Sequence, residues 1–147
     1  MTRRVLALAT TNRHKAREIA EILAAHGIDV EVPDSLPHVE ETGATFAENA
    51  ALKARSAAAH LGLPALADDS GLVVAALDGE PGVHSARFSG PDADAEKNNA
   101  RLVARLVEIG AVEPAAAFVC HAVVAAPDGR ILAEAEGRVE GTIRWPA

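Results

Sequence analysis

The chain has 147 residues, 49% of them hydrophobic and 24% charged, which is the composition of a folded domain and excludes a disordered protein. Its net charge of −7 argues against general binding to nucleic acid, and no apolar run is long enough to cross a membrane. The single cysteine, Cys120, excludes an internal disulfide, and the N-terminus lacks a signal-peptide pattern. These features predict a cytoplasmic protein.

Strand and helix patterns alternate along the first third of the chain. The apolar run "VLALAT", residues 5–10, predicts a buried strand. A helix that ends before Gly27 is expected next, because apolar residues recur on one helical face at Ala16, Ile19, Ala20 and Leu23. Residues 29–32 predict a second strand, and the acidic segment 33–44 predicts a turn-rich loop.

The clearest helix is predicted at residues 45–61. Its first residues, "TFAE", form a capping-box pattern in which Thr45 caps the amide of Glu48 and Glu48 reaches back. Alanines make up the expected buried stripe, while Thr45, Asn49 and Lys53 follow one another along a different face. Gly62 and Pro64 end this helix.

The remaining elements predict an α/β fold with a mixed sheet in a single domain, residues 1–147. We expect a strand at 64–67, a turn at "DDSG" and a second strand at 72–76. An irregular loop, a helix at 94–109 and a hairpin around "PDG" follow, and "RVEGTIRWPA" begins another strand.

The segment between the first strand and the first helix has the composition of an anion site. Hydroxyls at Thr10 and Thr11, the amide of Asn12 and the cations Arg13 and Lys15 surround the start of a helix. Cations are disfavoured there unless an anion binds, because the N-terminus of a helix carries a partial positive charge. We therefore expect a phosphate at this turn; the alternative is a capped helix with basic residues in its first turn.

Two acidic pairs, Glu40-Glu41 and Asp68-Asp69, are the candidate metal ligands. Adjacent carboxylates repel by about 4 kcal/mol at about 4 Å in a partly polar environment. The second pair ends an apolar strand, where ligands bind in open α/β sheets, and indicates either a bound cation or a carboxyl that keeps its proton. Both aspartates face one site only if the chain turns there, which Gly71 permits. Mg²⁺ prefers such carboxylates together with substrate phosphates.

Other polar residues are interpreted as structural or stay open. Ser85, Arg87 and Ser89 lie between glycines, where an ordered surface loop and substrate contact are equally expected. His121 lies in an apolar strand without paired metal-ligand spacing, so we interpret it as a structural histidine.

Four blocks together resemble one family. "LATTNRHKAREI", "EETGATFAENAALKA", "LADDSGLVVAALDGEPGVHSARFSG" and "EKNNARLVARL" are similar, in this order, to the inosine/xanthosine triphosphate pyrophosphatases, the HAM1-like family of enzymes that remove noncanonical purine nucleotides. The resemblance covers nearly the whole chain. It implies an elongated mixed sheet flanked by helices, with two lobes around a central cleft, in a cytoplasmic homodimer.

The resemblance also implies the reaction and the residues that carry it. The enzyme would use Mg²⁺ to hydrolyse ITP, dITP or XTP to the monophosphate and pyrophosphate. The triphosphate would bind the segment from Thr10 to Lys15, including His14, and would contact Lys53 and Ser70. Glu40 or Glu41 would bind the metal together with Asp69. Asp69 would also accept the proton of water, with Asp68 beside it.

The family pattern continues, after "EGTI", into a glycine-rich segment, a lysine and a Ser-His-Arg motif that the sequence through Ala147 does not contain. We therefore expect a C-terminally truncated relative that has the metal and phosphate half of the site without the base-reading half. Two alternatives stay open: a non-catalytic nucleotide-binding relative, and a Maf-like pyrophosphatase with a different base preference.

Overall fold

The structure is a computed structural model that describes residues 4–145. Residues 1–3, Pro146 and Ala147 lie outside the described residues. The chain divides into two compact units, each described separately below. Unit 1 contains the described residues up to Asp69 together with His121–Ala135, and unit 2 contains Ser70–Cys120 and the described residues from Glu136 onward. The single domain predicted from the sequence stays a prediction.

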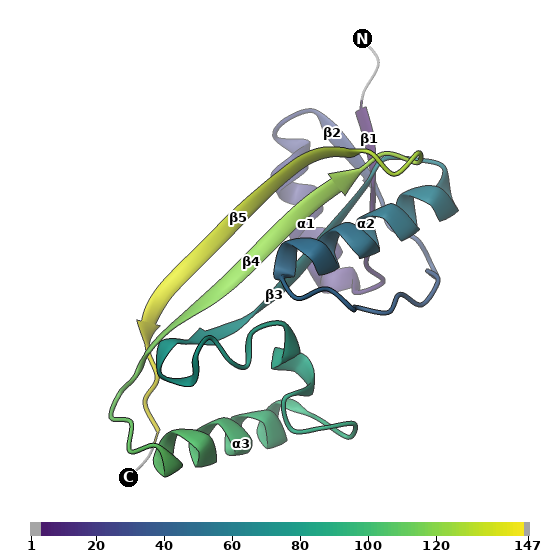
Figure 1. Cartoon of the computed structure of the whole chain (residues 1–147). Helices are drawn as coiled ribbons and strands as arrows, with labels where there is room; N and C mark the ends of the chain where they lie inside the picture. Colours follow the sequence, from purple (N-terminus) through teal and green to yellow (C-terminus); the bar gives the residue numbers. More distant parts are fainter. Residues whose placement is uncertain (1–3, 146–147) are drawn as a thin grey trace. The chain divides into compact units, whose positions relative to one another are not determined.

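Five strands form one mixed sheet in the order β2-β1-β3-β4-β5 (Figure 1). β1 (Arg4–Leu8) pairs in parallel with β2 (Ile28–Glu31) and with β3 (Ala65–Val74). β4 (Ala115–Ala125) and β5 (Ile131–Thr142) form the predicted hairpin. The predicted α/β class with a mixed sheet is confirmed.

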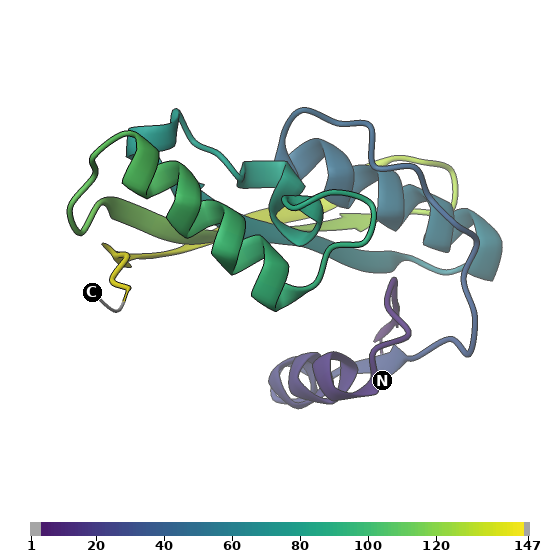
Figure 2. The same cartoon turned by 90° about the horizontal axis from the view of Figure 1, so that it is seen from below.

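In unit 1 two helices connect the parallel strands. α1 (Arg13–Ala24) links β1 to its neighbour β2, and α2 (Phe46–Leu61) links β2 to β3 on the other side of β1. Because both crossovers of such a sheet have the same hand, the two helices must cover opposite faces. Figure 2 shows α1 and α2 on either side of the strands of this unit.

α2 begins and ends where its sequence predicts. Thr45 is the N-cap, and its Oγ1 accepts a hydrogen bond from the backbone N–H of Glu48 at 3.1 Å. Glu48 reaches back one residue further than expected, since its Oε2 accepts from the N–H of Ala44 at 2.8 Å. Gly62 ends the helix with φ of 68°, in the left-handed region that glycine adopts without strain.

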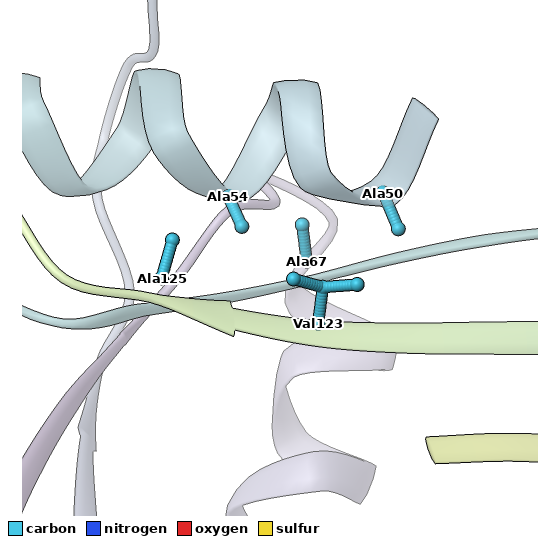
Figure 3. Packing of buried hydrophobic residues seen from close by; sticks show 5 residues of the cluster. All are labelled: Ala50, Ala54, Ala67, Val123 and Ala125. Atoms are coloured by element: carbon cyan, nitrogen blue, oxygen red, sulfur yellow. The ribbon is translucent and has the colours of Figure 1, made fainter. Parts of the chain in front are cut away.

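Alanines make the contact between α2 and the sheet. Ala50 and Ala54 of α2 pack on Ala67 of β3 and on Val123 and Ala125 of β4 (Figure 3). A neighbouring cluster joins the other end of α2 to the sheet at Ala7, Ala57, Ala58 and Ala65. Small side chains let the helix backbone approach the strands closely, so the position of α2 depends on these residues staying small.

Unit 2 has its own apolar core. Leu102 and Leu106 of α3 (Ala95–Glu108) pack against Val74 and Leu77. A short 3₁₀ helix, Gly82–Arg87, forms part of the expected irregular loop, and another, Ala75–Leu77, begins where the strand expected at 72–76 ends early, after Val74. Ser85 donates to the carbonyl of Gly82 and accepts from the N–H of Leu72, so its hydroxyl is used to hold this loop.

Two predicted breaks in strands are wrong. β3 runs as one strand through "DDSG"; β1 pairs with it before this segment, at Ala65 and Leu66, and β4 is its other hydrogen-bonded neighbour in the sheet. β5 likewise continues to Thr142 through Gly137, because most of it is an exposed edge strand, where a glycine costs no packing.

In the part of the chain that the structure describes, no helix is long and apolar enough to cross a membrane.

Candidate active site

The two adjacent aspartates of β3 face opposite sides of the sheet. Side chains alternate along a strand, and Ala65 and Ala67 face α2, so Asp69 faces α2 as well and Asp68 faces the other side. The expectation that a turn directs both carboxylates to one face is therefore wrong. Each aspartate is instead matched by a lysine from a different helix.

Asp68 pairs with the first turn of α1. The Nζ of Lys15 lies 2.6 Å from Oδ1 of Asp68, and both side chains are partly buried. The turn that brings Lys15 there is ordered by its own polar residues. Thr10 accepts from the N–H of Asn12 through its hydroxyl, and Asn12, the N-cap of α1, accepts from the N–H of Lys15.

The other residues of the predicted phosphate turn lie at the surface. Arg13 is 3.6 Å from Asp34, and His14 is 3.2 Å from Glu18, with every one of these side chains largely exposed. Thr11 is also exposed. Of the cations at the start of α1, Lys15 is therefore the one that the structure directs to a carboxylate of β3.

Asp69 pairs with Lys53 of α2, which also reaches Glu41 of the acidic loop. The Nζ of Lys53 lies 3.7 Å from Oδ1 of Asp69 and 3.3 Å from Oε1 of Glu41. One ammonium thus joins two carboxylates from segments that are far apart in sequence. The Asp69 side chain is the more buried of the two, at 14% exposed against 39% for Glu41.

Glu40 and Glu41 differ in their surroundings. Glu40 lies 3.2 Å from Nε2 of His38 and is 79% exposed, whereas Glu41 reaches Lys53. A hollow of about 180 Å³ opens beside Lys53 and is lined by Ala9, which follows β1, and by residues 36–39 of the acidic loop. Lys53 and the end of β1 therefore border the same hollow.

The loop that carries Glu41 is held against α2 by Asn49, a contact to which sequence reasoning gave no role. Asn49 is 2% exposed, its Oδ1 accepts from the N–H of Gly43 at 2.7 Å, and its Nδ2 donates to the carbonyl of Gly43 at 3.4 Å. The signal was an asparagine placed next to the alanine stripe of a helix, where a polar side chain needs partners.

The carboxylates of Glu41 and Asp69 suit a hard divalent cation. They already converge on one positive charge, and both offer oxygen, the donor that Mg²⁺ prefers. Within residues 4–145, no group of three or more His, Cys, Asp or Glu side chains is arranged as a metal cage. Mg²⁺ that arrives with phosphates needs no such cage, because it binds one or two carboxylates and takes its other ligands from phosphate and water.

Ser70 and His121 lie outside the group of ion pairs formed by Lys15, Lys53 and their carboxylates. Ser70, the next residue of β3, is exposed and belongs to unit 2, and its contact with substrate stays a prediction. His121 of unit 1 is largely buried, with Nε2 3.8 Å from Glu134 of the neighbouring strand, which agrees with the structural role expected for it.

Comparison with known proteins gives a consistent result. The model of the Ham1 family matches residues 6–147. A dITP/XTP pyrophosphatase of Thioalkalivibrio sulfidiphilus is 47% identical over 149 residues, which span 96% of this chain and 76% of that protein. One from an Exiguobacterium species is 49% identical, over 95% of this chain and 71% of its own length.

Solved structures agree with the sequence relatives. A HAM1 protein from Coxiella burnetii superposes with a TM-score of 0.88 at 38% identity, covering 95% of this chain and 73% of the other. The Ham1 protein of Staphylococcus aureus gives a TM-score of 0.82 at 36% identity. The resemblance noted in the four sequence blocks is confirmed, and this chain belongs to the Ham1 family.

Proposed function

We propose that this protein hydrolyses noncanonical purine nucleoside triphosphates, such as dITP, ITP and XTP, to the monophosphate and pyrophosphate. Its relatives are named dITP/XTP pyrophosphatases. The observation that carries the proposal is the use of Asp68 and Asp69 to hold two lysines, Lys15 and Lys53, at the carboxyl end of β1. In open α/β sheets this is where ligands bind.

The lysines supply the positive charge that a triphosphate requires. Hydrolysis of a phosphoanhydride depends mainly on charge neutralisation and on an aligned water, with little covalent chemistry for the protein to perform. Lys15 lies in the first turn of α1, where the helix dipole adds to its charge. Lys53 lies on the other helix, α2, and borders the hollow beside the acidic loop. In this proposal both ammonium groups bind phosphate oxygens.

Asp69 is the proposed proton acceptor. Its carboxylate is mostly buried and is fixed in direction by β3, so it can hold a water molecule and take its proton. Asp68 faces the other side of the strand and is proposed to position Lys15. The two neighbouring aspartates have different proposed roles because successive side chains of a strand point to opposite faces of the sheet.

Mg²⁺ is the proposed cofactor, held by Glu41 and Asp69, whereas Glu40 is less suited because it is exposed and paired with His38. Bound there, the metal would neutralise charge that develops on the phosphates and make water a better nucleophile. Lys53, which lies between the two carboxylates, would bind a phosphate oxygen. Magnesium dependence is part of the proposal.

The cellular setting is proposed with the same function. The sequence contains one cysteine, Cys120, and so has no internal disulfide, as expected of a protein in the reducing cytoplasm. The homodimer that the resemblance implies is likewise proposed. Light scattering of the purified protein, which gives its molar mass in solution, tests this proposal.

The test is release of pyrophosphate from a panel of ITP, dITP, XTP, ATP, dTTP and UTP, with and without Mg²⁺. We expect release from the first three with Mg²⁺. Asp69→Asn should lose at least 100-fold in kcat, a typical effect of removing a general base. Asp34→Asn, the same substitution at a carboxylate that is 96% exposed, should retain activity.

Three results would contradict the proposal or redirect it. Binding of ITP without pyrophosphate release would support a non-catalytic relative. Preference for dTTP or UTP would support a Maf-like specificity. Full activity of Asp69→Asn would remove Asp69 from the role of proton acceptor.

A further inference from the structure

Gly43 is held on both of its backbone groups by one side chain of α2. Asn49 accepts from the N–H of Gly43 at 2.7 Å and donates to its carbonyl at 3.4 Å. Among the described residues, Asn49 is the polar side chain that is buried like the core, at 2% exposed. Burial of an amide has a cost that only such hydrogen bonds offset, so this contact is specific.

The backbone at Gly43 lies too close to α2 for any side chain. A Cβ at this position would lie 2.6 Å from Cβ of Glu48 and 2.7 Å from Oδ1 of Asn49. Atoms that close would force the loop away from the helix. The glycine and the asparagine therefore define one contact, which we call the Asn49–Gly43 clamp.

The clamp lies next to the proposed metal ligand. Glu41 precedes Gly43 by two residues, and Lys53 follows Asn49 by one helical turn, so α2 holds the same short loop at two points. The Lys53–Glu41 pair joins the ends of two partly exposed side chains, whereas the clamp joins the buried side chain of Asn49 directly to the loop backbone. The clamp is thus the contact that fixes the backbone from which Glu41 extends.

We propose that Asn49 is a positioning residue that acts through Glu41 on the binding of the metal–triphosphate complex. The proposal rests on the proposed function. It differs from a purely structural role in one respect: the effect of Asn49 on ligand binding should require the carboxylate of Glu41. Mutation of residues that hold metal ligands in place without touching the metal commonly changes affinity by about 10- to 100-fold.

The experiment is a double-mutant cycle with Asn49→Ala and Glu41→Gln. Binding of the α,β-imido analogue of ITP in the presence of Mg²⁺ is measured by calorimetry, under conditions where circular dichroism shows each variant to be folded. We expect Asn49→Ala to weaken binding about 10- to 100-fold in the parent protein and less than about 3-fold in the Glu41→Gln background. Hydrogen exchange of residues 40–44 should become faster in Asn49→Ala.

Two further variants separate the clamp from general damage to α2. Gly43→Ala approaches the same contact from the loop side and should weaken binding about 10-fold or more, because its Cβ has no room. Thr45→Ala removes the helix cap while it leaves the clamp in place, and it should change binding less than about 2-fold. A large effect of Thr45→Ala would assign the loss to the helix terminus.

The outcomes distinguish this inference from the proposed function. Equal losses from Asn49→Ala with and without the Glu41 carboxylate would overturn the positioning role, although the parent protein still binds and hydrolyses ITP. No binding of the analogue and no turnover by the parent protein would instead overturn the proposed function, and the positioning role with it.

Discussion

Lys53→Met tests whether Glu41 and Asp69 are arranged for a shared cation. The ammonium of Lys53 lies 3.3 Å and 3.7 Å from these carboxylates. At an effective dielectric near 20 each attraction is on the order of 5 kcal/mol before desolvation and side-chain entropy are counted. Because the groups are partly exposed, the net stabilisation is far smaller, and we expect the free energy of unfolding to fall by about 1–2 kcal/mol.

Mg²⁺ should restore this loss. In Lys53→Met the two carboxylates face one positive charge fewer, so a divalent cation competes with no ammonium for them. A ligand at about 100 times its dissociation constant adds about 2.7 kcal/mol to stability. We therefore expect millimolar Mg²⁺ to stabilise the variant by about 1–3 kcal/mol, and to stabilise the parent protein less.

The assay is urea unfolding followed by far-UV circular dichroism, with MgCl₂ or with NaCl of the same ionic strength. Lys15→Met is the matched control, because Lys15 pairs with Asp68 on the opposite face of β3. Our reasoning fails if Mg²⁺ stabilises Lys53→Met no more than the parent protein. It fails equally if NaCl gives the same gain, since screening of repulsion would then suffice.

Three further variants test other parts of the structure. Lys15→Gln should raise KM for ITP about 10-fold or more while the free energy of unfolding falls by about 1 kcal/mol or less, because its ion pair is partly exposed; an unchanged KM would separate Lys15 from the triphosphate. Ala54→Leu should cost about 1–3 kcal/mol by overpacking the 0% exposed contact between α2 and the sheet, with urea unfolding as the measure; a neutral effect would show that α2 can move. Leu106→Ala should cost about 2–5 kcal/mol because Leu106 is completely buried in the core of unit 2, and a loss below 1 kcal/mol would contradict that packing.

Local chemistry made the helices predictable. Thr45 and Asp94 cap α2 and α3 through short hydrogen bonds to backbone amides three residues later, and glycines with positive φ follow each helix. Such signals are contained in a few neighbouring residues, so they can be identified without knowledge of the rest of the fold. The hairpin around "PDG" was predictable for the same reason.

The course of β3 was not predictable in this way. Two adjacent aspartates followed by Ser70-Gly71 have the composition of a turn, yet they form part of a continuous strand of the sheet. That outcome depends on residues far away in sequence. The same is true of Asn49, whose helical face was predicted but whose partner, Gly43, comes from the fold.

The sequence predicted which residues belong to the candidate site better than it predicted how they pair. Lys15, Lys53, Glu41, Asp68 and Asp69 were each expected from motifs, and the structure joins them by ion pairs. The sequence could not assign Asp68 to Lys15 and Asp69 to Lys53, because that assignment follows from the faces on which α1 and α2 lie.

Because Asp68 and Asp69 face opposite sides of β3, insertions and deletions are restricted in this part of the sequence. Insertion or deletion of a single residue between Ala65 and Asp68 would exchange the two carboxylates between faces and offer each lysine the wrong partner. Segment 32–45, by contrast, is a surface loop whose length can vary on the strand side, provided that the last few residues before α2 are kept. Among homologues, gaps should therefore gather in the early part of this loop and be missing from the β3 segment.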